Sequence, residues 1–319
     1  MKAGKTLLFK VAPVALIAAS MPGFAAQLSS DARTAIPHDV QQMVVIDYRI
    51  MQNSPTAMQL RGQVMPPELK QLEDALRKFG LDENADVEQL AFVLYRTGKS
   101  SDNLETVGIA QGQFPVDDVL ANLKKQRIKP TLWRTNKIYP MGKTGMSVVF
   151  VDESTLVFGS SGSVKTAMDV RDGLAPGLLS NGQVMDSMRS VDNEPLWSVL
   201  DEKGTQTMMK QVLGEAGSVA DFDTVKKRMV ASYYTMDFQH GVKFDMSVVT
   251  GDNFAAATVS SLLNAAILYK KMSGTDIEKQ ALADTSISSD AGRLDVHFAS
   301  SDDQFNTILK SPMFQSMVR

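Results

Sequence analysis

The chain has 319 residues, no cysteine, 44% hydrophobic residues and a formal net charge of −3. Without cysteine it can form no disulfide framework, no thiol nucleophile and no zinc–thiolate site. The acidic balance gives no bulk attraction to nucleic acid, and the apolar content is sufficient for a sizeable core.

Residues 1–25 have the features of a secretory signal peptide. Three lysines precede a short apolar run, and small residues precede the expected cleavage after Ala25. The run is much shorter than the roughly 20 residues of a membrane span, although an uncleaved anchor is the alternative. We therefore expect a periplasmic or secreted protein with no transmembrane span in the mature chain. A flexible polar lead-in is expected at 26–40.

Residues 41–172 are expected to form a first α+β unit. Residues 43–48 are rich in β-branched side chains and predict its first strand, whereas apolar residues three and four apart at 69–79 predict a helix. Further strands are expected at 89–95, 106–112 and 131–139, a second helix after Pro115, and a hairpin with a following helix at 146–171.

A Gly- and Pro-containing linker at 173–183 precedes a second unit at 184–319. This unit is expected to contain a short helix at 184–188, a strand at 196–200, a helix at 208–213, a hairpin at 230–250, a long helix at 253–271, and a closing hairpin and helix at 287–309. The closing segment repeats the order seen at 146–171. The sequence therefore predicts an α+β fold made of two similar units, each an antiparallel sheet with helices packed on one face. One continuous antiparallel sheet fits the same pattern.

Short strings that resemble catalytic motifs lack essential partners. Ser101-Asp102-Asn103 and Lys143-Thr144-Gly145 match two signatures of the serine β-lactamase fold, but no serine is followed by lysine at the third position. The serines at 160–163 are better explained as helix caps, and Ser301 with Gln304 as a capping box. The three histidines lack metal-ligand spacing. We assign no catalytic residue, no metal site and no cofactor.

A basic interval without acidic residues lies between Asp118 and Asp152. It is a candidate contact for a lipid head group, an anionic glycan or an acidic envelope protein, and a solvated surface balanced by distant acids is the alternative. Methionines crowd the second half, where they suit either an ordinary core or apolar ligand contact. The candidate ligand-binding residues are Lys124, Lys125, Arg127, Lys129, Trp133, Arg134 and Lys137.

Three strings resemble a group of exported bacterial proteins without assigned activity. They are Met65-Pro66-Pro67-Glu68-Leu69-Lys70, Gly108-Ile109-Ala110-Gln111-Gly112-Gln113-Phe114 and Lys243-Phe244-Asp245. The resemblance implies an exported α+β protein and transfers no functional residue. We predict a non-enzymatic envelope protein that binds a protein partner or an amphipathic or anionic ligand. A hydrolase with a site assembled from distant residues, and a purely structural assembly module, are the alternatives.

Overall fold

The computed structural model describes residues 27–98, 103–213, 226–311 and 314. The expected signal peptide therefore lies outside the described residues. The lead-in at 26–40 was expected to be flexible, but Ala32, Ala35 and Ile36 are fully buried. These apolar side chains belong to the core beside α1 (Ser30–Thr34), which explains why this segment is held in place.

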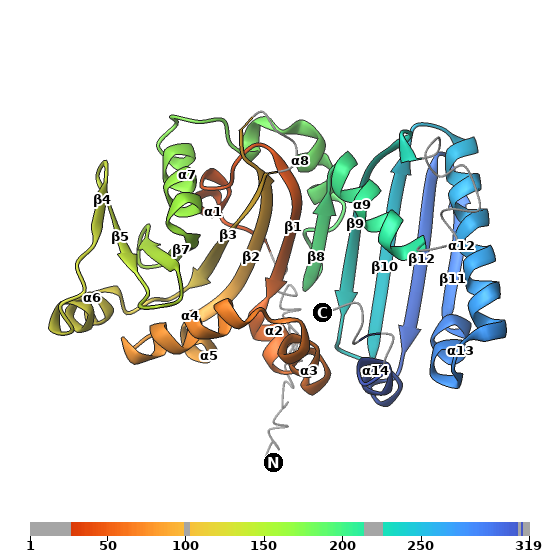
Figure 1. Cartoon of the computed structure of the whole chain (residues 1–319), viewed down its shortest axis with the longest axis horizontal. Helices are drawn as coiled ribbons and strands as arrows, with labels where there is room; N and C mark the ends of the chain where they lie inside the picture. The colour runs from red at the N-terminus through yellow and green to blue at the C-terminus, as the bar shows by residue number, and fades with distance from the viewer. Residues whose placement is uncertain (1–26, 99–102, 214–225, 312–313, 315–319) are drawn as a thin grey trace, which may run out of the picture.

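Twelve strands form one antiparallel sheet in the described part of the chain (Figure 1). Their order across the sheet is β11-β12-β10-β9-β8-β1-β2-β3-β7-β6-β5-β4. The strands are β1 (Val40–Asp47), β2 (Val87–Arg96), β3 (Leu104–Gly112), β4 (Thr131–Trp133), β5 (Asn136–Pro140), β6 (Met146–Phe150), β7 (Thr155–Ser160), β8 (Leu196–Leu200), β9 (Met229–Asp237), β10 (Val242–Thr250), β11 (Thr285–Asp290) and β12 (Arg293–Ser300).

The expected α+β class with antiparallel strands is confirmed, and the strands of both halves join in a single sheet. The halves meet where β1 pairs antiparallel with β8. Moving outward from this seam, the first half has the order β1-β2-β3-β7-β6 and the second has β8-β9-β10-β12-β11. The same order on both sides agrees with an internal duplication, which remains a prediction.

The remaining helices lie against the sheet or against one another. They are α2 (Tyr48–Gln52), α3 (Pro55–Val64), α4 (Pro67–Lys78), α5 (Glu83–Asp86), α6 (Val116–Lys125), α7 (Ser161–Arg171), the 3₁₀ turn η1 (Leu178–Ser180), α8 (Gly182–Arg189), α9 (Glu202–Leu213), α12 (Asn253–Ser273), α13 (Asp276–Ala283) and α14 (Asp302–Leu309). No described helix is both long and apolar enough to cross a membrane.

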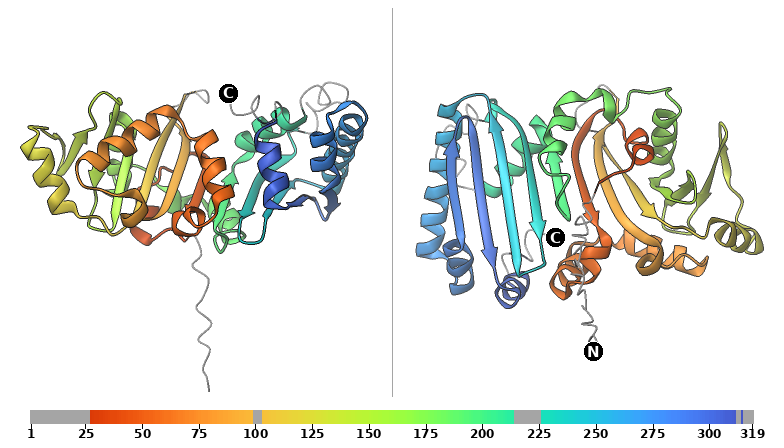
Figure 2. Two further views of the ribbon diagram at one scale, coloured as in Figure 1. Left: turned by 90° about the horizontal axis from the view of Figure 1, so that it is seen from below. Right: turned by 180° about the vertical axis from the view of Figure 1, so that it is seen from behind.

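Helices cover the two halves of the sheet differently. The face that carries α4, α6, α9 and α12, called the front face below, has helices over both halves. The opposite face is covered by α1 and α7 in the first half and by α8 beside β8 and β9, and Figure 2 shows β10 and β12 uncovered from behind. The expectation of helices on one face therefore holds for the outer strands of the second half, β10, β12 and β11. In the first half β2 is apolar on both sides, with Ala91 and Val93 on one side and Leu90 and Phe92 on the other.

Candidate ligand-binding cavity

Helix α4 lies over the front face of the first half. It begins after Pro66 with a proline in its first turn, which suits a helix start because the missing N–H has no partner there anyway. Leu69, Leu72 and Leu76 follow at spacings of three and four, so they share one side of the helix. Leu72 and Leu76 are buried against the sheet. The residues joining α3 to α4 are extended, so α4 is not a continuation of α3.

A small apolar cavity of about 50 Å³ lies between α4 and the sheet. The leucines of α4 form its roof, and the strands β2, β3 and β7 form its floor. Gly108 keeps space for the ring of Phe158, since a Cβ there would lie 2.1 Å from that ring. The lining residues are Tyr48, Leu69, Leu72, Glu73, Leu76, Leu81, Glu83, Val87, Leu90, Phe92, Ala110, Leu156 and Phe158. Such an apolar lining favours a dry interior.

The polar rim of this cavity has two carboxylates and two nearby guanidinium groups. Arg61 of α3 donates a hydrogen bond to Glu73 Oε1 and lies 3.5 Å from Glu83 Oε2. Its guanidinium also lies 5.3 Å from the centre of the Tyr48 ring. Arg77 donates to the other oxygen of Glu83 at 3.3 Å. Each carboxylate therefore has a guanidinium partner, and Arg61 lies close to both of them.

Burial raises the pKa of Glu73 to about 7, since the charged carboxylate loses water. The attraction of Arg61 lowers this pKa, and the negative charge of Glu83 raises it again. Burial also raises the pKa of Tyr48 to about 12, and its hydroxyl donates to Asn84 at 3.2 Å. Near neutral pH, Glu73 is therefore divided between its protonated and ionised forms.

Glu83 Oε2 is buried and accepts no hydrogen bond from any residue that the structure describes. The Arg61 guanidinium lies 3.5 Å away and offsets its charge without a hydrogen bond, so a donor supplied by a ligand would be favoured here. The Glu73 carboxyl lies within hydrogen-bonding reach of Glu83, so protonated Glu73 can donate to it. The site thus combines a dry apolar interior with a rim that accepts hydrogen bonds.

The basic residues predicted from sequence do not line this cavity. Those at the end of α6 and in the following loop are exposed. Trp133 instead packs towards α7, where its Nε1 donates to Asp169 at 3.0 Å and Lys165 Nζ lies 5.0 Å from its ring centre. Arg134 also donates to Asp169. The structure therefore places Lys124, Lys125, Arg127, Lys129, Trp133, Arg134 and Lys137 around α6 and the β4–β5 hairpin, and their ligand-binding role remains a prediction.

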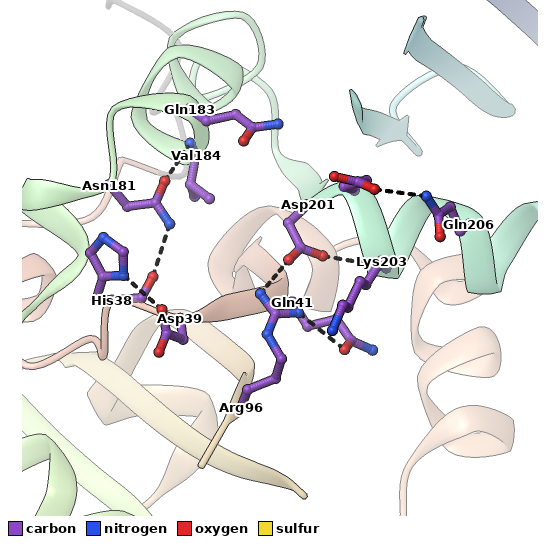
Figure 3. A network of polar contacts seen from close by, with 12 residues as sticks. His38, Asp39, Gln41, Arg96, Asn181, Gln183, Val184, Asp201, Lys203 and Gln206 are labelled. Carbon is purple, nitrogen blue, oxygen red and sulfur yellow. Dashed lines mark hydrogen bonds and ion pairs between the residues drawn. The ribbon is translucent and has the colours of Figure 1, made fainter. Parts of the chain in front are cut away.

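A second polar cluster lies at the seam between the two halves (Figure 3). Arg96 of β2 donates to Asp201, and to Gln41 Oε1 at 3.3 Å. The other oxygen of Asp201 accepts from the backbone of Gly204 at 2.8 Å, in the first turn of α9. Asn181 caps α8 in the same region. The side chains of Arg96, Gln41 and Asp201 thus pair with one another, and the pairing of Arg96 with Asp201 links the two halves.

The serines considered in the sequence have structural partners. Ser160 accepts from the backbone of Ser163 as the N-cap of α7, and Ser163 donates to Glu105 at 2.9 Å. Ser301 and Gln304 form the predicted capping box of α14. Within the described ranges, no group of three His, Cys, Asp or Glu residues is placed to hold a metal ion.

The rim residues Arg61, Glu73 and Glu83 were not identified from the sequence. The apolar stripe of α4 predicted a helix with a buried side. A glutamate such as Glu73 is common on such a helix and does not indicate a binding site. The two residues beside Glu73 are Arg61 of α3 and Glu83 of α5, and only the fold brings the three together. A useful signal was the pair of prolines at 66 and 67, which marks where a separate helix begins.

Comparison with known proteins adds little to this picture. No family model matches the chain, and no curated protein matches its sequence. Among solved structures, crystal form I of TP0453 has a TM-score of 0.49 at 10% identity, covering 90% of this chain and 98% of that one. Crystal form III of TP0453 has the same TM-score and identity, with coverage of 89% and 98%. Likeness at this level carries no information about function.

Proposed function

We propose that this chain is an exported, non-enzymatic envelope protein that binds the apolar chain of an amphipathic molecule between α4 and the sheet. The observation that carries this proposal is the apolar cavity bordered by a buried carboxylate oxygen that accepts no hydrogen bond from the described residues. The signal-peptide features of residues 1–25 support export.

The size of the cavity indicates how a ligand would enter. Sites for drug-sized molecules usually measure about 300–1,000 Å³, so the cavity of about 50 Å³ holds only a small apolar group. A longer chain therefore needs α4 to move away from the sheet. This movement would open the floor towards Phe92, which pairs with the half-buried Val44 on β1. Apolar surface then continues from the cavity towards the seam.

The rim favours a head group that donates hydrogen bonds. Glu83 Oε2 is available as an acceptor, and the ionised form of Glu73 adds a second. A hydroxyl or an ammonium group matches these acceptors, because both can donate. A carboxylate or phosphate would instead have to displace Glu73 from Arg61 or Glu83 from Arg77. We therefore propose a hydroxylated or amino-substituted amphiphile as the ligand.

The test is native mass spectrometry of the mature protein titrated with dodecylamine, dodecanol and dodecanoate. We expect uptake of the amine and the alcohol and weaker uptake of the acid. Ala110→Leu fills the cavity and should abolish uptake, whereas Ala283→Leu, at an exposed position on α13, should leave it unchanged. Glu83→Gln should weaken amine binding more than alcohol binding. The proposal would be refuted if the parent chain, Ala110→Leu and Ala283→Leu all bound the three compounds equally well.

A further inference from the structure

The β4–β5 hairpin projects from one end of the sheet (Figure 1). It pairs with β6 through the last two residues of β5. One side of the hairpin is fixed to α7 and its C-cap. Trp133 of β4 donates to Asp169 at 3.0 Å, and Asn136 of β5 donates to Asp172 at 3.3 Å. Because both strands contact the same helix, the hairpin is held in a defined orientation.

The other side of the hairpin carries Leu132 and Lys137, which lie directly opposite each other in the pair. Lys137 faces the same way as Tyr139, two residues further along β5, and Tyr139 packs with residues of α4 and α6. Leu132 and Lys137 therefore lie on the front side, where α6 also lies. Residues 126–130 join the end of α6 to the start of β4. The end of α6 and the front side of the hairpin are therefore neighbours.

Basic side chains share this end of the molecule with Leu132. The exposed ones on α6, in the loop after it and on β5 are Lys124, Lys125, Arg127, Lys129 and Lys137. Within the described ranges these five form no ion pair, whereas Arg134 pairs with Asp169 at 2.8 Å. Asp117 and Asp118 lie in the first turn of α6, at the opposite end of a ten-residue helix about 15 Å long. We call the five cations together with Leu132 the basic hairpin surface.

Leu132 distinguishes between the partners that basic residues attract. It is 68% exposed, and a soluble anionic glycan would use the cations and leave this apolar side chain in water. An anionic bilayer uses both, because it takes apolar side chains at the boundary with the acyl chains and cations at the phosphates. Lysine and arginine have long apolar stems that let their charges stay at this level. Since the whole chain has a net charge of −3, an anionic surface attracts this end and repels the rest, which sets the orientation.

We propose that the basic hairpin surface docks this protein on an anionic lipid bilayer, with Leu132 inserted beneath the head groups. None of its residues lines the α4 cavity, so docking goes beyond the proposed function and does not depend on it. A basic residue close to an anionic surface strengthens binding about fivefold, and burial of one leucine strengthens it about tenfold. Because most of this attraction is electrostatic, we expect reversible binding that is lost at high salt.

The first test is flotation of the mature chain with vesicles that contain phosphatidylglycerol and phosphatidylcholine, and with vesicles of phosphatidylcholine alone. We expect binding to the anionic vesicles, weaker binding at high salt, and little binding to the neutral ones. A triple variant should bind the anionic vesicles on the order of 100-fold more weakly. Its changes are Lys124→Gln, Lys125→Gln and Lys137→Gln.

The matched control loses the same charge at exposed positions in the second half and should bind like the parent chain. Its changes are Lys227→Gln, Lys243→Gln and Lys310→Gln. A parent chain that does not float with anionic vesicles would overturn the proposal. Equal losses of binding in the two triple variants would also overturn it, because the position of the charges would then have no effect.

The second test separates the bilayer from other partners and other surfaces. Leu132→Gln should weaken vesicle binding about tenfold, whereas Leu174→Gln, at a linker position that is 57% exposed, should leave it unchanged. Vesicle binding that dextran sulfate competes away and that Leu132→Gln leaves unchanged would assign the basic residues to a soluble polyanion. Leu268, on the exposed side of α12, is another apolar candidate. Binding that is lost in Leu268→Gln and kept in Leu132→Gln would place docking there, and either result would overturn the proposal.

Discussion

Replacing Glu73 by glutamine should remove a pH dependence of stability that the parent chain has. The pKa of Glu73 is raised from 4.5 to about 7 by burial. The folded state therefore keeps a proton that the unfolded chain releases, and stability falls as pH rises through this window. A rise of this size in the pKa corresponds to about 3 kcal/mol of lost stability once the carboxyl is ionised in both states. Because Arg61 can rearrange and water can reach the rim, we expect about 1–3 kcal/mol.

The assay is urea unfolding at pH 5 and at pH 8. The free energy of unfolding of the parent chain should decrease more between these pH values than that of Glu73→Gln. Glu153→Gln, in the exposed β6–β7 turn, is the control and should follow the parent chain. Hydrogen exchange of α4 should show the same difference locally, with faster exchange in the parent chain at pH 8. Parallel pH profiles of the free energy of unfolding for the parent chain and Glu73→Gln would show that burial does not raise the pKa of Glu73.

Three further changes test the seam, the cavity floor and a helix cap. Arg96→Met and Asp201→Asn should each lower the free energy of unfolding by about 2–4 kcal/mol, because each leaves a partly buried partner unpaired. A double-mutant cycle in urea should show a coupling energy of about 1–3 kcal/mol, and strictly additive effects would contradict the ion pair. Gly108→Ala should cost about 1–3 kcal/mol by thermal unfolding, since its methyl group meets the Phe158 ring. Phe158→Leu should recover part of that loss if the clash is the cause. Ser160→Ala should cost about 1 kcal/mol through loss of the α7 cap, whereas Ser160→Asp should retain most of the stability.

Part of the candidate site could be predicted from local pattern. The apolar spacing of Leu69, Leu72 and Leu76 predicted α4 and its buried side. The rim could not be predicted, because Arg61 and Glu83 reach Glu73 from separate helices whose packing depends on the whole sheet. Sequence reasoning favoured the basic interval near residue 124 instead. Charge counts along a chain do not show whether side chains converge on one cavity.

The sequence by itself determined the type and approximate position of most elements. Alternating apolar residues predicted the strands, and serine caps placed the starts of α7 and α14, because these preferences act between residues close in the chain. The repeated hairpin and helix at 146–171 and 287–309 was visible for the same reason. Tertiary structure decided that β1 pairs with β8, so both halves share one sheet. It also decided that helices cover both faces from the first half as far as β8 and β9, and one face beyond them. An apolar side chain shows that a surface is buried, but it does not show which partner buries it.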